Sequence, residues 1–260
     1  MKTKSLLAAM LLTVCGTAYA QTTMKITFKN AEQEVVTYNV EDIQDVTWEV
    51  TQATDERAVD LGLPSGTLWA NQNVGYTTEN PYGNYYAWGE VKPNKTSYTW
   101  GNYTLSDGSY NTITKYVTDD AYGEEVDNYT ALLPEDDAAV KDPEWGAHWR
   151  IPTAEQFQEL IDNCTWAYET DAAKVKWVVL TSKNNGAQIK FPGSGYFDGA
   201  KVQQKGMTAF IWLQELNVDY NSQAYEGVFA TSSVFASSSF KVYPSGQRYF
   251  GQAIRPVFVP

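Results

Sequence analysis

Turn-forming residues interrupt this chain at short intervals, and they limit what it can fold into. Glycine, proline and asparagine supply the backbone conformations of tight turns and end helices and strands. The segments left between these breaks are short, which favours many short antiparallel strands. The clearest turn clusters are Leu63-Pro64-Ser65-Gly66, Pro81-Tyr82-Gly83-Asn84, Asn184-Asn185-Gly186, Pro192-Gly193-Ser194-Gly195 and Pro244-Ser245-Gly246.

One of these turns predicts a β-hairpin. Asn-Asn-Gly joins residues 175–181 to residues 187–191, and both runs are rich in strand-forming residues. A short helix is expected to begin near Pro134, with Glu135, Asp136 and Asp137 in its first turn, where carboxylates suit the helix dipole. Few helices and many short strands together predict an α+β domain.

A second, longer helix is predicted from Thr153 onward. Thr153 and Gln156 have the spacing of a capping box, in which each side chain bonds to the backbone of the other residue. The apolar residues that follow recur at i, i+3, i+4 and i+7, the spacing of one buried helix face. These residues are Phe157, Leu160, Ile161 and Cys164.

The first 20 residues have the pattern of a cleavable secretory signal peptide. Lys2 and Lys4 precede an apolar run that is too short to span a membrane, and the run ends in Ala18-Tyr19-Ala20. We therefore expect cleavage before Gln21 and a protein that is secreted or held at the cell surface. No later stretch approaches the length of a membrane span.

Residues 21–50 predict a small three-stranded β-module. Apolar residues fall on even positions in three runs, the alternation of half-buried strands. Residues 51–56 are polar and without periodicity, so we interpret them as a linker to a main domain over residues 57–260. The alternating residues are Ile26, Phe28, Val36, Tyr38, Val40, Val46, Trp48 and Val50.

Cysteine count and charge narrow the class of protein. Cys15 lies in the signal peptide, so Cys164 is the single thiol of the secreted chain and no intrachain disulfide can form. The formal net charge is −12, and loss of Lys2 and Lys4 makes it two units more negative. Such a surface repels phosphate backbones and anionic membranes, which argues against nucleic-acid binding.

Several blocks of the main domain resemble the Fibrobacter succinogenes major paralogous domain family. The resemblance covers most of residues 57–260. It implies a relative of the formylglycine-generating, sulfatase-modifying fold, which is a decorated C-type-lectin-like fold, and secretion by a Bacteroidetes-type bacterium. The blocks are Val59–Ala70 with Asn73-Val74-Gly75, Tyr82–Glu90, Glu135–Ala139, Trp149–Thr153 and Gly251–Val257.

This fold hosts enzymes, lectins and binding proteins alike, so the residues must decide the activity. Formylglycine-generating enzymes use a cysteine pair, whereas the secreted chain has only Cys164, which we interpret as a buried, inert thiol. His148 is the only histidine, which excludes a metal centre built on histidines. Glu135-Asp136-Asp137 is interpreted as a helix start rather than a metal site. We expect no enzyme activity, no metal and no cofactor.

Acidic residues between Asp119 and Asp127 offer oxygen ligands for calcium, but they follow no calcium-loop spacing. The residues are Asp119, Asp120, Glu124, Glu125 and Asp127. Sugar-binding C-type lectins carry Glu-Pro-Asn or Gln-Pro-Asp, and Glu79-Asn80-Pro81 has the wrong order. If the chain binds sugar, aromatic stacking is therefore the expected means.

The aromatic residues divide into two groups. Those in the family-like blocks are expected to be scaffold: Trp69, Trp88, Trp149 and Trp166. The segment 209–249 mixes tyrosine, asparagine, glutamine and serine, which is the composition of adaptable recognition surfaces. We predict ligand-binding residues there: Trp212, Tyr220, Tyr225, Tyr243 and Tyr249.

The sequence thus predicts a non-enzymatic binding or adhesion protein that recognises an extracellular glycan or peptide. Two alternatives stay open. One is a structural subunit of a surface assembly, joined to its partner through the amino-terminal strands. The other is a carbohydrate-active or lipid-modifying enzyme of unknown type.

Overall fold

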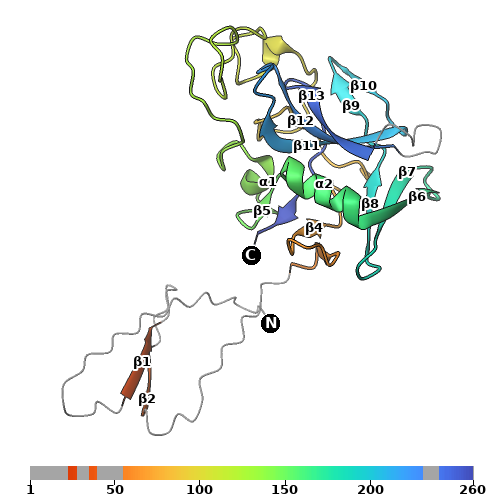
Figure 1. The fold of residues 1–260 in the computed structure, drawn as a ribbon. Helices are drawn as coiled ribbons and strands as arrows, with labels where there is room; N and C mark the ends of the chain where they lie inside the picture. Colours follow the sequence, from red (N-terminus) through yellow and green to blue (C-terminus); the bar gives the residue numbers. More distant parts are fainter. Residues whose placement is uncertain (1–22, 28–34, 40–54, 231–239, 260) are drawn as a thin grey trace. The chain divides into compact units, whose positions relative to one another are not determined.

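The computed structural model describes residues 23–27, 35–39, 55–230 and 240–259 (Figure 1). The chain divides into two compact units, Met1–Thr54 and Asp55–Pro260. The predicted signal peptide, with Cys15, and residues 51–54 of the predicted linker lie outside the described residues. No helix of the described residues is long and apolar enough to cross a membrane.

The described residues of the first unit form two antiparallel strands, β1 (Thr23–Thr27) and β2 (Val35–Asn39). Their register pairs Met24 with Tyr38 and Ile26 with Val36, so the apolar even positions of the two strands stand opposite each other. Two of the three predicted strands are therefore confirmed. The third predicted run, which ends at Val50, lies outside the described residues.

The second unit is mostly β-sheet with few helices. Three of its sheets share a simple antiparallel pattern of pairing, in the orders β3-β4-β14-β5, β6-β7-β8 and β11-β12-β13, and β9 and β10 form a hairpin. Between β4 and α1 the chain has one short 3-10 helix, η2, and otherwise turns and isolated bridges. The elements are β3 (Ala58–Asp60), β4 (Leu68–Ala70), η2 (Trp100–Asn102), α1 (Ala138–Lys141), β5 (Trp149–Arg150), α2 (Ala154–Asn163), β6 (Cys164–Thr170), β7 (Lys176–Ser182), β8 (Gln188–Pro192), β9 (Tyr196–Asp198), β10 (Lys201–Gln203), β11 (Thr208–Leu216), β12 (Gln223–Ala230), β13 (Phe240–Gln247) and β14 (Val257–Phe258).

The predicted hairpin and the longer predicted helix are both confirmed. Strands β7 and β8 pair across Asn184-Asn185-Gly186. The Thr153 side chain accepts from the Gln156 backbone at 3.1 Å, and the Gln156 side chain accepts from the Thr153 backbone at 2.9 Å. The helix ends one residue earlier than the apolar pattern, because Cys164 is extended and begins β6.

The shorter helix starts later than predicted. Asp137 is its N-cap rather than part of its first turn, and its buried carboxylate accepts from Ala139 N at 2.9 Å and from Ile151 N at 2.9 Å. Glu135 and Asp136 lie before the helix and pair with Lys115 instead. The acidic cluster is thus divided between a cap and an ion pair, and both roles belong to the fold.

Helix α2 lies against the three-stranded sheet β11-β12-β13 (Figure 1). Phe157 is fully buried at this contact, and a Cβ atom on Gly227 of β12 would lie 2.3 Å from its ring. Only glycine therefore lets the helix approach the sheet this closely. The Phe157 ring packs 4.7 Å from that of Phe229, within a core cluster that also contains residues of β7 and β8.

Arg248 is fully buried and joins distant parts of the chain. Its guanidinium group donates to Tyr103 Oη at 3.0 Å and to the backbone oxygens of Lys115 and Asn221 at 2.8 and 3.1 Å. The same group lies 4.9 Å from the centre of the Trp88 ring. Carbonyl oxygens and aromatic faces thus compensate its charge, and the long loop after η2 is fixed to the β-sheet core.

Candidate functional site

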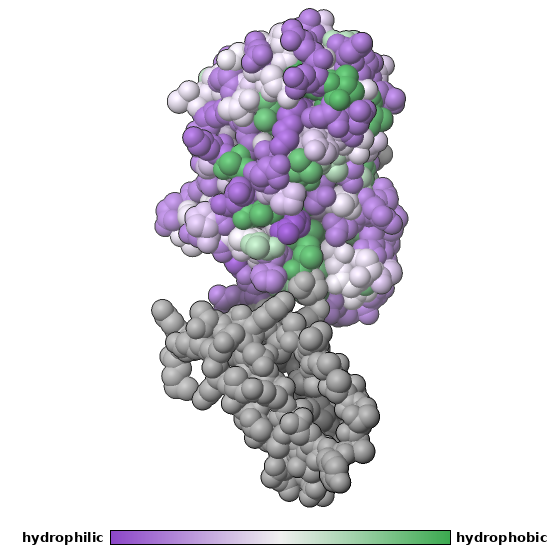
Figure 2. Space-filling model, turned by 90° about the vertical axis from the view of Figure 1, so that its left-hand side faces the viewer, coloured by the Kyte–Doolittle hydropathy of each residue, from purple (hydrophilic) through white to green (hydrophobic). Residues whose placement is uncertain are grey.

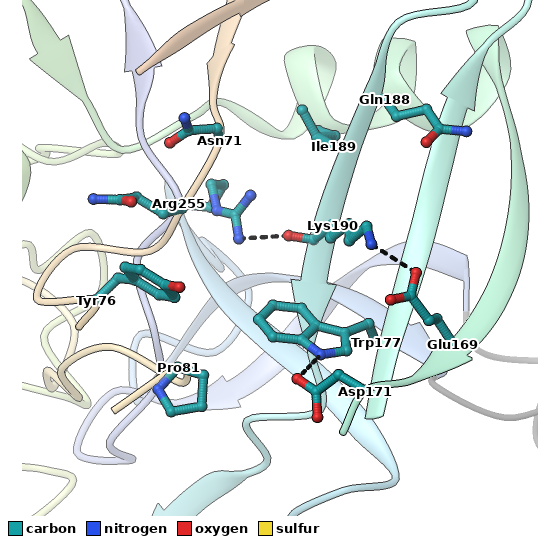
Figure 3. A pocket seen from close by; sticks show the side chains of 11 residues that line it. Asn71, Tyr76, Pro81, Glu169, Asp171, Trp177, Gln188, Ile189, Lys190 and Arg255 are labelled. Atoms are coloured by element: carbon teal, nitrogen blue, oxygen red, sulfur yellow. Dashed lines mark hydrogen bonds and ion pairs between the residues drawn. The ribbon is translucent and has the colours of Figure 1, made fainter. Parts of the chain in front are cut away.

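A cavity of about 580 Å³ opens between the sheet β6-β7-β8 and the segment 71–81 (Figure 3). Its size falls within the range of small-molecule sites. Aromatic rings, amides and charged groups line it together. The lining residues are Asn71, Gln72, Tyr76, Pro81, Glu169, Asp171, Trp177, Gln188, Ile189, Lys190 and Arg255.

The sheet wall follows from strand alternation. Val178 and Leu180 of β7 are buried on the inner face of the sheet, so Trp177 points to the outer face. Glu169 of β6 is the direct register partner of Trp177. Lys190 of β8 lies on the same face, because Ile189 and Phe191 beside it are buried. One flat wall therefore presents a half-buried indole and an ion pair.

Asp171 fixes the orientation of the Trp177 ring. The indole N–H of Trp177 donates to Asp171 Oδ2 at 2.9 Å, and the backbone N–H of Val175 donates to Asp171 Oδ1 at 2.9 Å. The hydrogen bond from Trp177 is the largest cause that lowers the pKa of Asp171. The carboxylate therefore stays ionised and holds the ring in place.

The opposite wall is a turn-rich loop that carries Tyr76 and Pro81, and Figure 3 shows these rings across the cavity from Trp177. Gly83 holds the loop closed, because its φ is +75° and a Cβ atom there would lie 2.6 Å from Val74 O. The buried amide of Asn73 donates to Tyr82 O at 2.9 Å. The wall that carries Tyr76 is thus held by a glycine turn and by a side-chain hydrogen bond of Asn73, and not by a helix or strand.

Arg255 connects the two walls through its hydrogen bonds. Its side chain donates to Asn73 Oδ1 at 2.8 Å and to Ala70 O at 3.1 Å in the loop, and to Lys190 O at 2.8 Å in the sheet. Its guanidinium carbon lies 4.2 Å from the centre of the Phe191 ring. Burial lowers the pKa of Arg255 to about 9, which leaves the group charged at neutral pH.

The polar groups that face the cavity are mostly neutral or paired. Lys190 Nζ lies 2.6 Å from Glu169 Oε2, so the two charges offset each other. The side-chain amides of Asn71 and Gln72 donate to no residue in the described parts of the chain. The pocket therefore offers two rings and free amide groups, which suit a ligand rich in hydroxyl groups.

Trp212 does not form part of a ligand surface, contrary to the prediction. It is 0% exposed, and its indole N–H donates to Tyr86 O at 2.8 Å. Strand β11 pairs with β12 on one side and forms a parallel bridge through Ile211 on the other, and its two faces contribute to different core clusters. The run that contains Trp212 is buried on both faces for this reason.

The other four predicted residues lie apart from the cavity. Tyr225 is half-buried against the core, and Tyr249 packs 5.2 Å from Trp100. Tyr220 is 57% exposed in the turn between β11 and β12, whereas Tyr243 is 40% exposed on β13. None of the four lines the cavity. The structure thus does not gather the predicted set into one site.

The residues that form the cavity carry a weak sequence signal. Trp177 stands at an outward position of the predicted hairpin, so strand alternation could have identified it as half-exposed. Tyr76 follows a glycine in an irregular loop and has no periodic pattern around it. The two residues are brought together by tertiary folding alone.

Of the expected scaffold tryptophans, Trp69, Trp88 and Trp149 are fully buried. Trp166 was predicted wrongly, since it is 45% exposed at the edge of the sheet and stacks 4.4 Å from Phe240. Its strand, β6, has a partner on one side only, so a side chain at this edge is incompletely covered.

Residues that often perform catalysis lie elsewhere. Cys164 is buried, and burial raises the pKa of its thiol to about 11. His148 is exposed and packs on Phe258. Within the described ranges, no three residues of His, Cys, Asp or Glu are grouped so that they could hold a metal ion.

No family model, curated protein or solved structure matches the chain. No relative therefore supplies a ligand or an activity by similarity.

Proposed function

We propose that this chain is a binding protein that holds an uncharged glycan in the cavity between Tyr76 and Trp177. The observation that carries the proposal is the presence of two aromatic rings on opposite walls, with free amides beside them. A sugar ring presents an apolar face to aromatic rings and hydroxyl groups to amides. Few, well-placed polar groups in an aromatic pocket are typical of specific small-molecule sites.

Charge favours a neutral ligand over an ionic one. The cavity contains two acidic and two basic side chains, and each charge has a partner in the protein: Lys190 with Glu169, Asp171 with the Trp177 indole, and Arg255 with carbonyl and amide oxygens. An ionic ligand would have to compete with these contacts. The net charge of −12 further disfavours anionic ligands at long range.

The acids of the cavity support a binding role rather than glycoside hydrolysis. A general acid needs a carboxyl group whose pKa is raised toward neutrality. The pKa of Asp171 is lowered instead, and Glu169 forms an ion pair with Lys190. We therefore infer that the bound ligand is released unchanged.

We also infer that the chain is exported and that its main domain belongs to the C-type-lectin-like fold of the Fibrobacter succinogenes major paralogous domain family. The signal-peptide pattern that ends at Ala20 supports export. The order of the sequence blocks between Val59 and Val257 supports the family. A mostly β-sheet unit with few helices is compatible with this fold.

The test is a glycan array, with a peptide array as its counterpart, screened with the secreted protein in the presence and absence of EDTA. We expect glycan binding that EDTA does not change. Trp177→Ala and Tyr76→Ala should each weaken it about tenfold or more, as loss of a central aromatic contact does. Trp166→Ala is the matched control, since this exposed tryptophan lies on the adjacent strand outside the cavity, and it should change the affinity less than about twofold.

Three outcomes would contradict the proposal: no glycan binds, only peptides bind, or Trp177→Ala binds as tightly as Trp166→Ala. The first of these would favour the structural-subunit alternative. Thermal unfolding of each variant shows whether a loss of binding arises from the site or from the fold.

A further inference from the structure

Large aromatic and aliphatic side chains are exposed on the long loop after η2 and on the turn that precedes β12. On the face that Figure 2 draws, strongly hydrophobic residues are scattered among hydrophilic ones. Tyr110 is 56% exposed on the loop, and Tyr220 is similarly exposed on the turn. Val218 of the same turn and Tyr129 of the loop are also large exposed residues. Large exposed residues that occur singly on a protein surface need no explanation, whereas a group of them on adjoining segments is typical of an interaction site.

Hydrogen bonds bring the loop and the turn together. Thr118 N donates to Asn221 Oδ1 at 2.7 Å, and Thr118 Oγ1 donates to Val218 O at 3.3 Å. Ile113 N donates to Tyr122 O at 2.8 Å within the loop. The tyrosines therefore come from segments that are separate in sequence and adjacent in space.

Tyr122 lies on the loop beside the turn, because its backbone N–H donates to Asp119 O at 3.1 Å and Asp119 N donates to Asn221 Oδ1 at 3.2 Å. Burial is the largest cause that raises the pKa of the Tyr122 phenol, and the negative charge of Asp119 raises it further. Tyr110 lies three residues before Ile113, whose backbone N–H donates to Tyr122 O, so hydrogen bonds place Tyr110, Tyr122 and Tyr220 on adjoining backbone segments. We call Tyr110, Tyr122 and Tyr220 together the tyrosine surface.

The backbone beneath the tyrosine surface is held in place. Asp127 accepts hydrogen bonds from the backbone N–H groups of Tyr116, Val117 and Tyr129 at 2.7, 3.0 and 3.0 Å. Arg248 binds the base of the same loop through Lys115 O. A preformed surface loses little conformational entropy when a partner binds, which favours recognition.

The charge around the tyrosine surface is negative. Carboxylates of Asp107, Glu124 and Glu125 line a hollow of about 300 Å³ in the same loop, and Asp119 and Asp120 are close to it in sequence. Lys115 is the single basic residue between residues 103 and 130, and it is engaged by Glu135 and Asp136. Basic side chains of a partner would therefore be attracted by the carboxylates of this loop, and its one lysine is already paired.

We propose that the tyrosine surface docks a basic, arginine-containing segment of another protein. A guanidinium group stacks on the face of a tyrosine ring and forms paired hydrogen bonds with carboxylates. An arginine side chain can therefore bind the tyrosines and the acidic residues of this surface together. A second copy of this chain does not fit, because its net charge is −12 as well. The proposal is independent of glycan binding in the cavity.

The experiment measures binding of the secreted protein to three short synthetic peptides in which serine alternates with arginine, lysine or glutamate. We expect the arginine peptide to bind best, the lysine peptide to bind more weakly and the glutamate peptide not to bind. The double variant Tyr110→Ser, Tyr220→Ser should weaken arginine-peptide binding about tenfold, with its salt dependence unchanged. The double variant Glu124→Gln, Glu125→Gln should weaken it and also reduce the salt dependence.

Matched controls are chosen from other parts of the chain. Tyr243→Ser removes an exposed tyrosine from β13, and Glu79→Gln with Glu144→Gln removes two exposed carboxylates elsewhere. Both controls should leave binding within about twofold of the unchanged protein. The proposal is overturned if the arginine peptide does not bind at physiological salt, because the surface then has no specific affinity for arginine. It is also overturned if the tyrosine variant binds as tightly as the control variants, because binding would then be general attraction between opposite charges.

Discussion

The carboxyl group of Glu226 has one hydrogen-bond partner within the described chain, the side-chain amide of Gln252, and both side chains are buried. No basic residue of the described chain compensates Glu226, and burial raises its pKa to about 7. The remaining amide oxygen of Gln252 has no partner among the described residues. A neutral Glu226 avoids the cost of an uncompensated buried charge and keeps an acceptor oxygen for the Gln252 amide.

This pair predicts that stability falls as pH rises. The unfolded carboxyl has a pKa of 4.5, whereas the folded one titrates near 7, so the folded protein holds this proton more tightly. Nothing is lost below pH 4.5, the loss grows between pH 4.5 and 7, and above pH 7 it amounts to about 3 kcal/mol. Urea unfolding of Glu226→Gln against the unchanged protein should show the variant gaining stability at pH 8 but not at pH 4. Parallel pH profiles for the two proteins would contradict this assignment.

Trp212 and Tyr243 should respond to substitution in opposite ways. Trp212→Ala removes a fully buried ring and is expected to lower the free energy of unfolding by about 3–5 kcal/mol. Tyr243→Ala, on an exposed edge, should change it by less than about 1 kcal/mol. Chemical denaturation measures both. Equal effects would show that Trp212 is not a core residue.

Cys164 should be unreactive in the folded protein. Its thiol is buried and its pKa is raised to about 11, so little thiolate is present at pH 8. A maleimide reagent should label this cysteine rapidly in urea and very slowly in buffer. Rapid labelling in buffer would mean that β6 opens at its first residue. Cys164→Ala should cost about 1–2 kcal/mol and leave ligand binding intact.

Asp171 should act on glycan binding through Trp177. Asp171→Ala removes the acceptor that orients the indole, and we expect affinity to fall about three- to tenfold, equivalent to one hydrogen bond. Asp171→Asn keeps an oxygen that can accept from the indole N–H and should restore most of the affinity. Calorimetric titration separates the two variants. If both lose affinity equally, the charge of Asp171 matters rather than its contact with Trp177.

Local signals predicted the local parts of this structure. The Asn-Asn-Gly hairpin and the capping box at Thr153 depend on a few adjacent residues, and both form where expected. The shorter helix starts three residues later than its acidic cluster suggested, because Asp137 also bonds to Ile151 of a distant segment and is needed as a cap. Contacts of that kind cannot be read from neighbouring residues.

Sequence patterns do not predict the residues of the candidate site. Tyr76 and Trp177 lie about a hundred positions apart in the sequence. The walls that carry them are joined by hydrogen bonds of Arg255 to Asn73 and Lys190, which neither motif nor periodicity identifies. Composition singled out the segment around Trp212 instead. Tyrosine and tryptophan occur both in cores and at recognition surfaces. Trp212 is a core residue because the face of β11 that carries it is covered by a second core cluster.

The contacts of Arg248 divide the loop after η2 into positions that must be kept and positions that are free to change. Its guanidinium group binds Tyr103, Lys115, Tyr116 and Asn221, and three of these four hydrogen-bond partners are backbone oxygens that any residue supplies. Between the first two anchors, Leu105 packs against the core and Ile113 is buried, whereas Tyr110 is 56% exposed and belongs to none of the core clusters of the described residues. Substitution of exposed residues at the tip of this loop, such as Tyr110, is therefore expected to leave the anchoring contacts of Arg248 unchanged.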